Sequence, residues 1–191
     1  MLAIASYGLI AELRTPRHKK HVDDTLYNGM KDIMSIATDE LRAGFERAFS
    51  FNEEVKYTNT TNYKDFVSKV LGAMGDLIFS IEIPENKEDF YILSDFGAAT
   101  TRERINDYFN PDAKDIAYIG LPLSSKIYIH FFSSKLKFIQ RPPGIHHIDS
   151  NKVYLLNKAN YDYTNQFTAC ESGEYLQSFI QSAINANLNS S

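Results

Sequence analysis

The polar residues with the clearest potential for chemistry follow a short apolar stretch near the middle of the chain. Ser94 and Asp95 come directly after residues 90–93 and precede Phe96-Gly97, so a hydroxyl and a carboxylate stand where a strand is expected to enter a turn. Asp-Phe-Gly is also the tripeptide with which protein kinases present a magnesium-binding aspartate. The chain has no glycine-rich phosphate loop, no His-Arg-Asp loop and no later Ala-Pro-Glu, so we do not expect a kinase.

Two interpretations of Ser94 and Asp95 are open. Their side chains can bond nearby backbone groups and shape the turn, or they can present ligand-binding groups at the end of a strand. A sharper hypothesis joins Asp95 to Arg14, either as a buried ion pair that docks an N-terminal helix on the sheet or as one edge of a pocket. Breaking a buried pair typically costs about 3–5 kcal/mol, so loss of function on mutation would not by itself show catalysis.

A basic segment lies near the N-terminus. Residues 14–21, RTPRHKKH, contain no acid, and Arg14, Arg17 and His18 are candidate ligand-binding residues. If a helix begins at Pro16, these cations lie in its first turn and the helix dipole favours an anion or phosphate there. If one kinked helix continues through Pro16, no helix end is exposed, and the lysines pair with acids four residues later.

The sequence contains no established motif for a metal site or for a catalytic nucleophile. His18, His21 and Asp24 share a helix face, but the chain has no His-Glu-x-x-His motif and only one cysteine, Cys170. Ser124-Ser125 lies outside any Gly-x-Ser-x-Gly motif and is typical of a hairpin turn. We therefore expect neither a bound metal nor a cofactor.

Composition favours an ordinary folded protein. The length of 191 residues fits one domain, and 43% hydrophobic residues is typical of a globular chain. The net charge of −4 argues against a nucleic-acid partner. The apolar opening stretch is shorter than the roughly 20 residues of a membrane span and has no preceding basic region, and a single cysteine fits a reducing compartment. We expect a cytoplasmic protein with no membrane partner; its oligomeric state is open.

The period of the apolar residues changes along the chain and predicts an α+β fold. Apolar residues spaced by threes and fours predict kinked or paired N-terminal helices within residues 1–74, and the same spacing returns over 150–187, before a frayed tail at 188–191. Between them, residues 76–141 are expected to form a small, mostly antiparallel sheet. The expected strands are residues 76–84, 90–94, 115–123 and 126–132, and 141–149 is expected to be a rigid loop.

Four short motifs also occur in a recognisable order. They are Arg14-Thr15-Pro16, Ser94-Asp95, Pro122-Leu123-Ser124 and an asparagine, Asn157, in a late helix. In this order they resemble a widespread bacterial family, domain-of-unknown-function family 4238. The resemblance implies that Ser124 and Asn157 join the site, and it brings no established activity. Phe96-Gly97 stands where the family has Asn-Pro, and the family's His-x-x-Pro opening is absent, so we expect a member truncated at its N-terminus.

Two functions from different classes follow. The first is a binding or interaction module that recognises a small anionic ligand or a protein partner, in a bacterial setting such as phage defence. The second is a metal-dependent phosphodiester hydrolase, with Asp95 as metal ligand and Arg14, Arg17 or Lys126 as phosphate clamps. The two readings are separated by what Asp95 faces.

Overall fold

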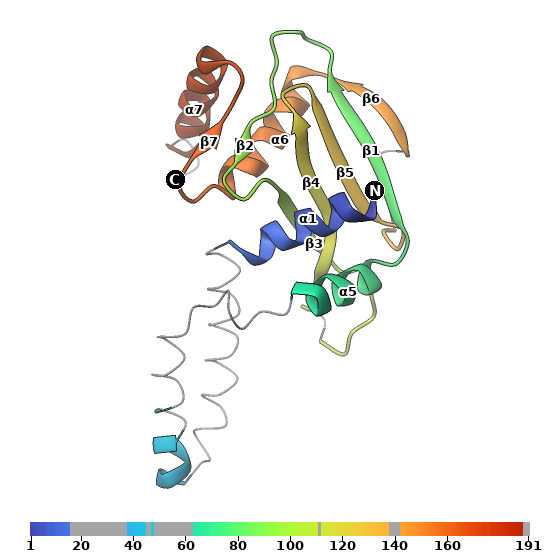
Figure 1. Cartoon of the computed structure of the whole chain (residues 1–191), viewed down its shortest axis with the longest axis vertical. Coiled ribbons are helices and arrows are strands. Elements are labelled where there is room, and N and C mark those ends of the chain that lie inside the picture. Colours follow the sequence, from blue (N-terminus) through green and yellow to red (C-terminus); the bar gives the residue numbers. More distant parts are fainter. Residues whose placement is uncertain (16–37, 45–46, 48–62, 111, 138–141, 189–191) are drawn as a thin grey trace.

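The chain folds around a five-stranded sheet with helices on both faces (Figure 1). The computed structural model describes residues 1–15, 38–44, 47, 63–110, 112–137 and 142–188. The elements in chain order are α1 (Leu2–Leu13), α5 (Tyr63–Met74), β1 (Leu77–Pro84), β2 (Leu93–Ser94), β3 (Ala99–Glu103), β4 (Asp115–Ser124), β5 (Ile127–Ser133), β6 (Gly144–Ile148), α6 (Ser150–Asp162), β7 (Thr168–Ala169) and α7 (Gly173–Leu188). Helices at both ends and a sheet between them confirm the α+β prediction.

The main sheet has the strand order β3-β4-β5-β1-β6 and is mostly antiparallel. Only β6 runs parallel to its neighbour β1. The loop prediction for residues 141–149 is therefore wrong over β6. Two prolines and a glycine open that segment, and nothing local shows that β1 offers a free edge for it to pair with.

One face of the sheet is covered by α1 and α5. Ala5 and Leu9 of α1 and Met74 of α5 pack with Ile119 and Phe131 in one buried cluster. The first helix approaches the sheet closely, because a Cβ added at Gly8 would lie 2.5 Å from the side chain of Ile119. The second helix expected within residues 1–74 lies largely outside the described residues; within them, 39–44 are helical and exposed.

The opposite face carries α6, with α7 packed outside it. Successive residues of β5 point to opposite faces, so Tyr128 joins Tyr91, Ile148 and Val153 of α6 while its neighbour Ile129 faces α1. Next, α7 packs against α6 and the chain near residue 92, where Phe179 contacts the rings of Tyr154 and Tyr161.

A connecting segment, residues 89–97, joins these layers. It was expected to be a strand over 90–94, but only β2 pairs, with β7, in a separate two-stranded sheet. Before β2, the side-chain amide of Asn157 takes the place of a neighbouring strand. Its Oδ1 accepts the Ile92 N–H (3.0 Å) and its Nδ2 donates to the Phe90 carbonyl (2.8 Å). Asn157 is fully buried, and its amide thereby fastens the segment to α6.

The turn at Phe96-Gly97 explains the kinase-like tripeptide. Gly97 has φ +79°, a conformation that glycine adopts without strain, and its N–H bonds the carbonyl and the hydroxyl of Ser94 at 2.9 and 3.1 Å. A Cβ at Gly97 would lie 2.8 Å from the hydroxyl of Tyr7 on α1. Phe96 packs against the same cluster as α1. The tripeptide therefore serves the turn and the core.

Replacing Gly97 with alanine should destabilise the protein. A left-handed residue other than glycine costs about 1–2 kcal/mol, and the contact with Tyr7 adds to this. The matched control is Gly72→Ala in α5, where a Cβ would meet nothing within 4 Å and helix propensity favours alanine by about 0.5–1 kcal/mol. Urea unfolding should give shifts of opposite sign; a neutral or stabilising Gly97→Ala would contradict this account of the turn.

Candidate functional site

The carboxylate of Asp95 bonds the loop that follows α6. Its two oxygens accept the backbone N–H groups of Asn165 (3.1 Å) and Gln166 (3.0 Å), and its own N–H donates to the carbonyl of Phe167 (3.1 Å). These partners are about seventy residues away in the chain, so Asp95 does more than shape its own turn. Asp95 fastens the turn at 94–97 to the chain leading into β7.

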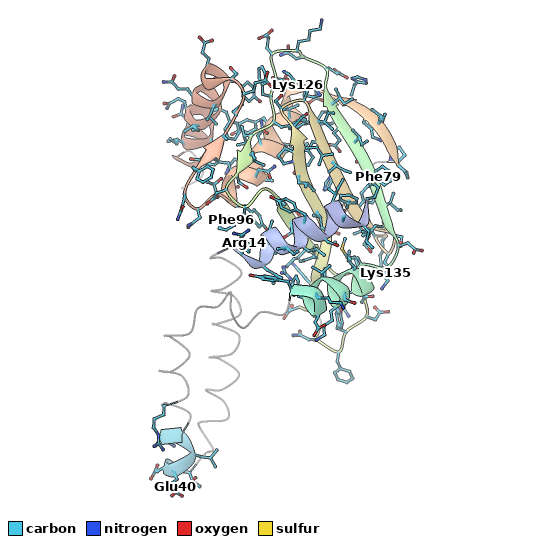
Figure 2. The ribbon with its side chains drawn as sticks, in the orientation of Figure 1. Arg14, Glu40, Phe79, Phe96, Lys126 and Lys135 are labelled. Carbon is cyan, nitrogen blue, oxygen red and sulfur yellow. The ribbon has the colours of Figure 1, made fainter. Side chains whose placement is uncertain are left out.

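The expected ion pair between Arg14 and Asp95 is wrong: no such pair forms, although both residues are described. Arg14 is exposed at the end of α1 (Figure 2). The helix is docked by Glu12, a 5%-exposed residue whose carboxylate accepts from the Thr100 hydroxyl (2.8 Å) and from Arg102 (3.5 Å). Glu12 is three residues after the buried Leu9 and so shares its helix face, whereas Arg14 points elsewhere.

The other predicted site residues have separate places. Ser94 is buried and shapes the turn, and Asn157 is buried within the fold. Ser124 is exposed in the β4–β5 hairpin, where its hydroxyl accepts the Lys126 N–H (3.2 Å). Arg17 and His18 lie outside the described residues. Of the described predicted residues, only Ser124 lines the pocket described next.

A pocket of about 330 Å³ lies between the tip of the β4–β5 hairpin and the β2–β7 sheet. A break in the β4–β5 register between Pro122 and Ser124 shapes its hairpin side. Proline fits here because β3 pairs with β4 only as far as Gly120 and the register is already irregular. The bulge leaves Leu123 46% exposed. The lining residues are Tyr91, Leu93, Pro122, Leu123, Ser124, Ser125, Ala169, Cys170 and Glu171.

The walls of this pocket are bonded to one another. The Tyr91 N–H donates to the Ser125 carbonyl (2.9 Å), which joins the connecting segment to the hairpin. Leu93 is paired with Ala169 across the two-stranded sheet. The Ser125 hydroxyl donates to the Glu171 carboxylate, which closes the third side. The pocket is therefore held open by bonds between elements distant in the sequence.

The chemistry of the lining is mainly apolar. Burial raises the pKa of Tyr91, as do the nearby Tyr128, Tyr175 and Asp89, so its phenol stays protonated and donates to the Glu82 carbonyl (3.2 Å). Among the described residues that line the pocket, Glu171 is the only acid, and none is Lys or Arg. This arrangement suits binding an apolar group rather than activating a nucleophile.

A second polar cluster lies on the sheet face of Tyr128, the face that carries α6. The Ser80 hydroxyl donates to the fully buried Glu82 (3.4 Å), and the His130 Nδ1 is 4.0 Å from the same oxygen. Burial lowers the pKa of His130 to about 4, so its imidazole is neutral at pH 7. Among the described residues no group of three or more His, Cys, Asp or Glu side chains is placed to hold a metal ion.

Comparisons with known proteins identify no relative of this chain. No protein-family model matches the chain, and no significant match occurs among curated proteins or solved structures. The resemblance to domain-of-unknown-function family 4238 therefore stays a prediction. In the part of the chain that the structure describes, no helix is both long and apolar enough to span a membrane.

The docking of α1 gives a direct test. Glu12→Ala should lower the free energy of unfolding by about 1–3 kcal/mol, because Arg102 loses its carboxylate partner and the buried Thr100 hydroxyl keeps only the Tyr163 hydroxyl, 3.2 Å away. Arg14→Ala, two residues away on the exposed side, should change it by no more than about 0.5 kcal/mol. Chemical denaturation measures both. A larger loss for Arg14→Ala than for Glu12→Ala would restore the arginine as the residue that docks the helix.

Proposed function

We propose that this chain is a binding module and that the pocket beside the β4–β5 hairpin receives part of a partner protein. The observation that carries the proposal is the pocket itself, an open hollow of about 330 Å³ with mostly apolar walls and a few polar groups. Preformed pockets of this character are the usual form of a ligand site. Its walls are linked by hydrogen bonds, so little ordering is required when an occupant enters.

The surroundings of the pocket favour a protein over a small anion. Leu93 and Leu123, both pocket residues, are 45% and 46% exposed. Ile127, opposite Ser124 in the hairpin, is 38% exposed, and Phe167, two residues before the β2 partner Ala169, is 60% exposed. Neighbouring exposed apolar side chains are typical of protein contact surfaces. Glu171 would repel an anion in the pocket. An anion site at the basic segment 14–21 stays a prediction, because residues 16–21 lie outside the described ones.

The hydrolase alternative is not favoured by the surroundings of its proposed residues. Both oxygens of Asp95 already accept backbone N–H groups. Lys126 is far from Arg14 (Figure 2), and its ammonium donates to the carbonyls of Lys87 and Asp89. Thermal stabilisation by Mg²⁺ or Mn²⁺ in the wild type, lost in Asp95→Asn, would reverse this preference.

A minimal probe tests the pocket. N-acetyl-leucine amide, a blocked leucine without charge, should shift the backbone amide signals of Ser125, Ala169 and Cys170 in a two-dimensional NMR titration, because its side chain enters the apolar pocket. Leu123→Asp should weaken the binding severalfold. Leu155→Asp, at a 58%-exposed leucine on α6, is the matched control and should bind as the wild type does.

Two outcomes would contradict the proposal. One is a titration in which no pocket amide shifts at the highest soluble concentration of the probe. The other is equal binding by the wild type and Leu123→Asp, which would place the probe outside the pocket.

A further inference from the structure

We infer that the partner segment carries a lysine or arginine directly beside the apolar residue that enters the pocket. This inference rests on the proposed function, and it adds the chemistry that selects the occupant. It follows from the charge of the pocket wall, the orientation of the nearest lysine and the shape of basic side chains.

The charge of the wall comes from Glu171. Its Oε2 accepts the hydroxyl of Ser125, which orients the carboxylate against the hairpin. Within the described part of the chain Glu171 forms no ion pair and no other side-chain hydrogen bond, and it is exposed. The carboxylate therefore has an oxygen available at the edge of the pocket, next to the lining residue Cys170.

The nearest lysine in the hairpin is directed away from this carboxylate. The Lys126 ammonium donates to the carbonyls of Lys87 (2.6 Å) and Asp89 (2.5 Å) and lies 3.3 Å from the centre of the Phe90 ring. It is held by three groups outside the pocket lining. Lys126 therefore forms no ion pair with Glu171, and the carboxylate in the pocket lining favours a cation.

A basic side chain matches both parts of this surface. Lysine and arginine have apolar stems that lie along hydrophobic walls while the charged end reaches a polar edge. A leucine-sized side chain would contact Leu93 and Leu123, and the neighbouring basic residue would extend across the wall to Glu171. An acidic residue at the same position of the partner segment would be repelled by Glu171, so the carboxylate also disfavours segments with an acid there.

The expected selectivity is modest because Glu171 is exposed. An ion pair of this kind contributes little in high dielectric and is screened by salt, so it changes affinity by about two- to fivefold. The ion pair mainly discriminates between partner segments of different sequence, and the apolar contact supplies most of the affinity.

Three blocked dipeptides test the inference: N-acetyl-Leu-Lys-amide, the same peptide with an acetylated lysine, and N-acetyl-Leu-Glu-amide. NMR titration of the whole chain at low salt should give the tightest binding for the lysine peptide. The acetyl-lysine peptide should bind about two- to fivefold more weakly, and the glutamate peptide more weakly again. In Glu171→Gln the lysine and acetyl-lysine peptides should bind equally, and 0.5 M NaCl should reduce the difference in the wild type.

The failures are distinguishable. Equal shifts of the pocket amides by all three peptides would overturn the charge preference and leave the pocket as a binding site. A preference for lysine that persists in Glu171→Gln would place the cation elsewhere and also overturn the inference. If none of the peptides shifts the pocket amides, both the inference and the proposed function fail.

Discussion

The side-chain amide of Asn157 is the interaction on which the arrangement of the layers depends. It pairs with the backbone on both sides of Tyr91 and also donates to the hydroxyl of Tyr175 (3.1 Å), so one buried group links the connecting segment, α6 and α7. A buried backbone N–H or carbonyl without a partner costs about 1–3 kcal/mol. Because residues 90–92 have no strand beside them, the fold needs an asparagine there to satisfy those groups.

The pocket follows from this attachment. The amide holds Tyr91 where its N–H meets the carbonyl of Ser125, and the chain then enters β2, which pairs with β7. Asp95 completes the connection by bonding the loop before β7. The hairpin, the connecting segment and the chain after α6 are thereby placed around one pocket, and Glu171 is the single acid among the described residues that line it.

The local sequence pattern predicted most helices and the inner strands. It predicted less well the contacts between segments that are distant in the chain. Short segments rich in Ile, Tyr and Phe and bounded by turn residues predicted β1, β4 and β5, and the Ser124-Ser125 turn followed from the two strands that flank it. The two edge strands, β3 and β6, were missed because their pairing with β4 and β1 makes them strands, not a local apolar pattern. Asn157 was selected through a motif order, yet its buried role depends on partners some sixty-five residues away. The role of Glu12 in docking α1 could have been predicted, since Glu12 lies on the same helix face as the buried Leu9. Nothing in the sequence around Glu171 indicated that it would line a pocket.

The most direct test is native-state amide hydrogen exchange in Asn157→Ala, with the exposed Asn151→Ala in the same helix as the control. We predict a loss of about 2–4 kcal/mol in unfolding free energy, from two buried backbone groups at roughly 1–3 kcal/mol each. We also predict selective loss of protection at the Ile92 amide and at the pocket amides of Tyr91 and Ala169, while β4 and β5 remain protected. Wild-type protection at Ile92, with a stability equal to that of Asn151→Ala, would contradict the central place of this amide in the structure.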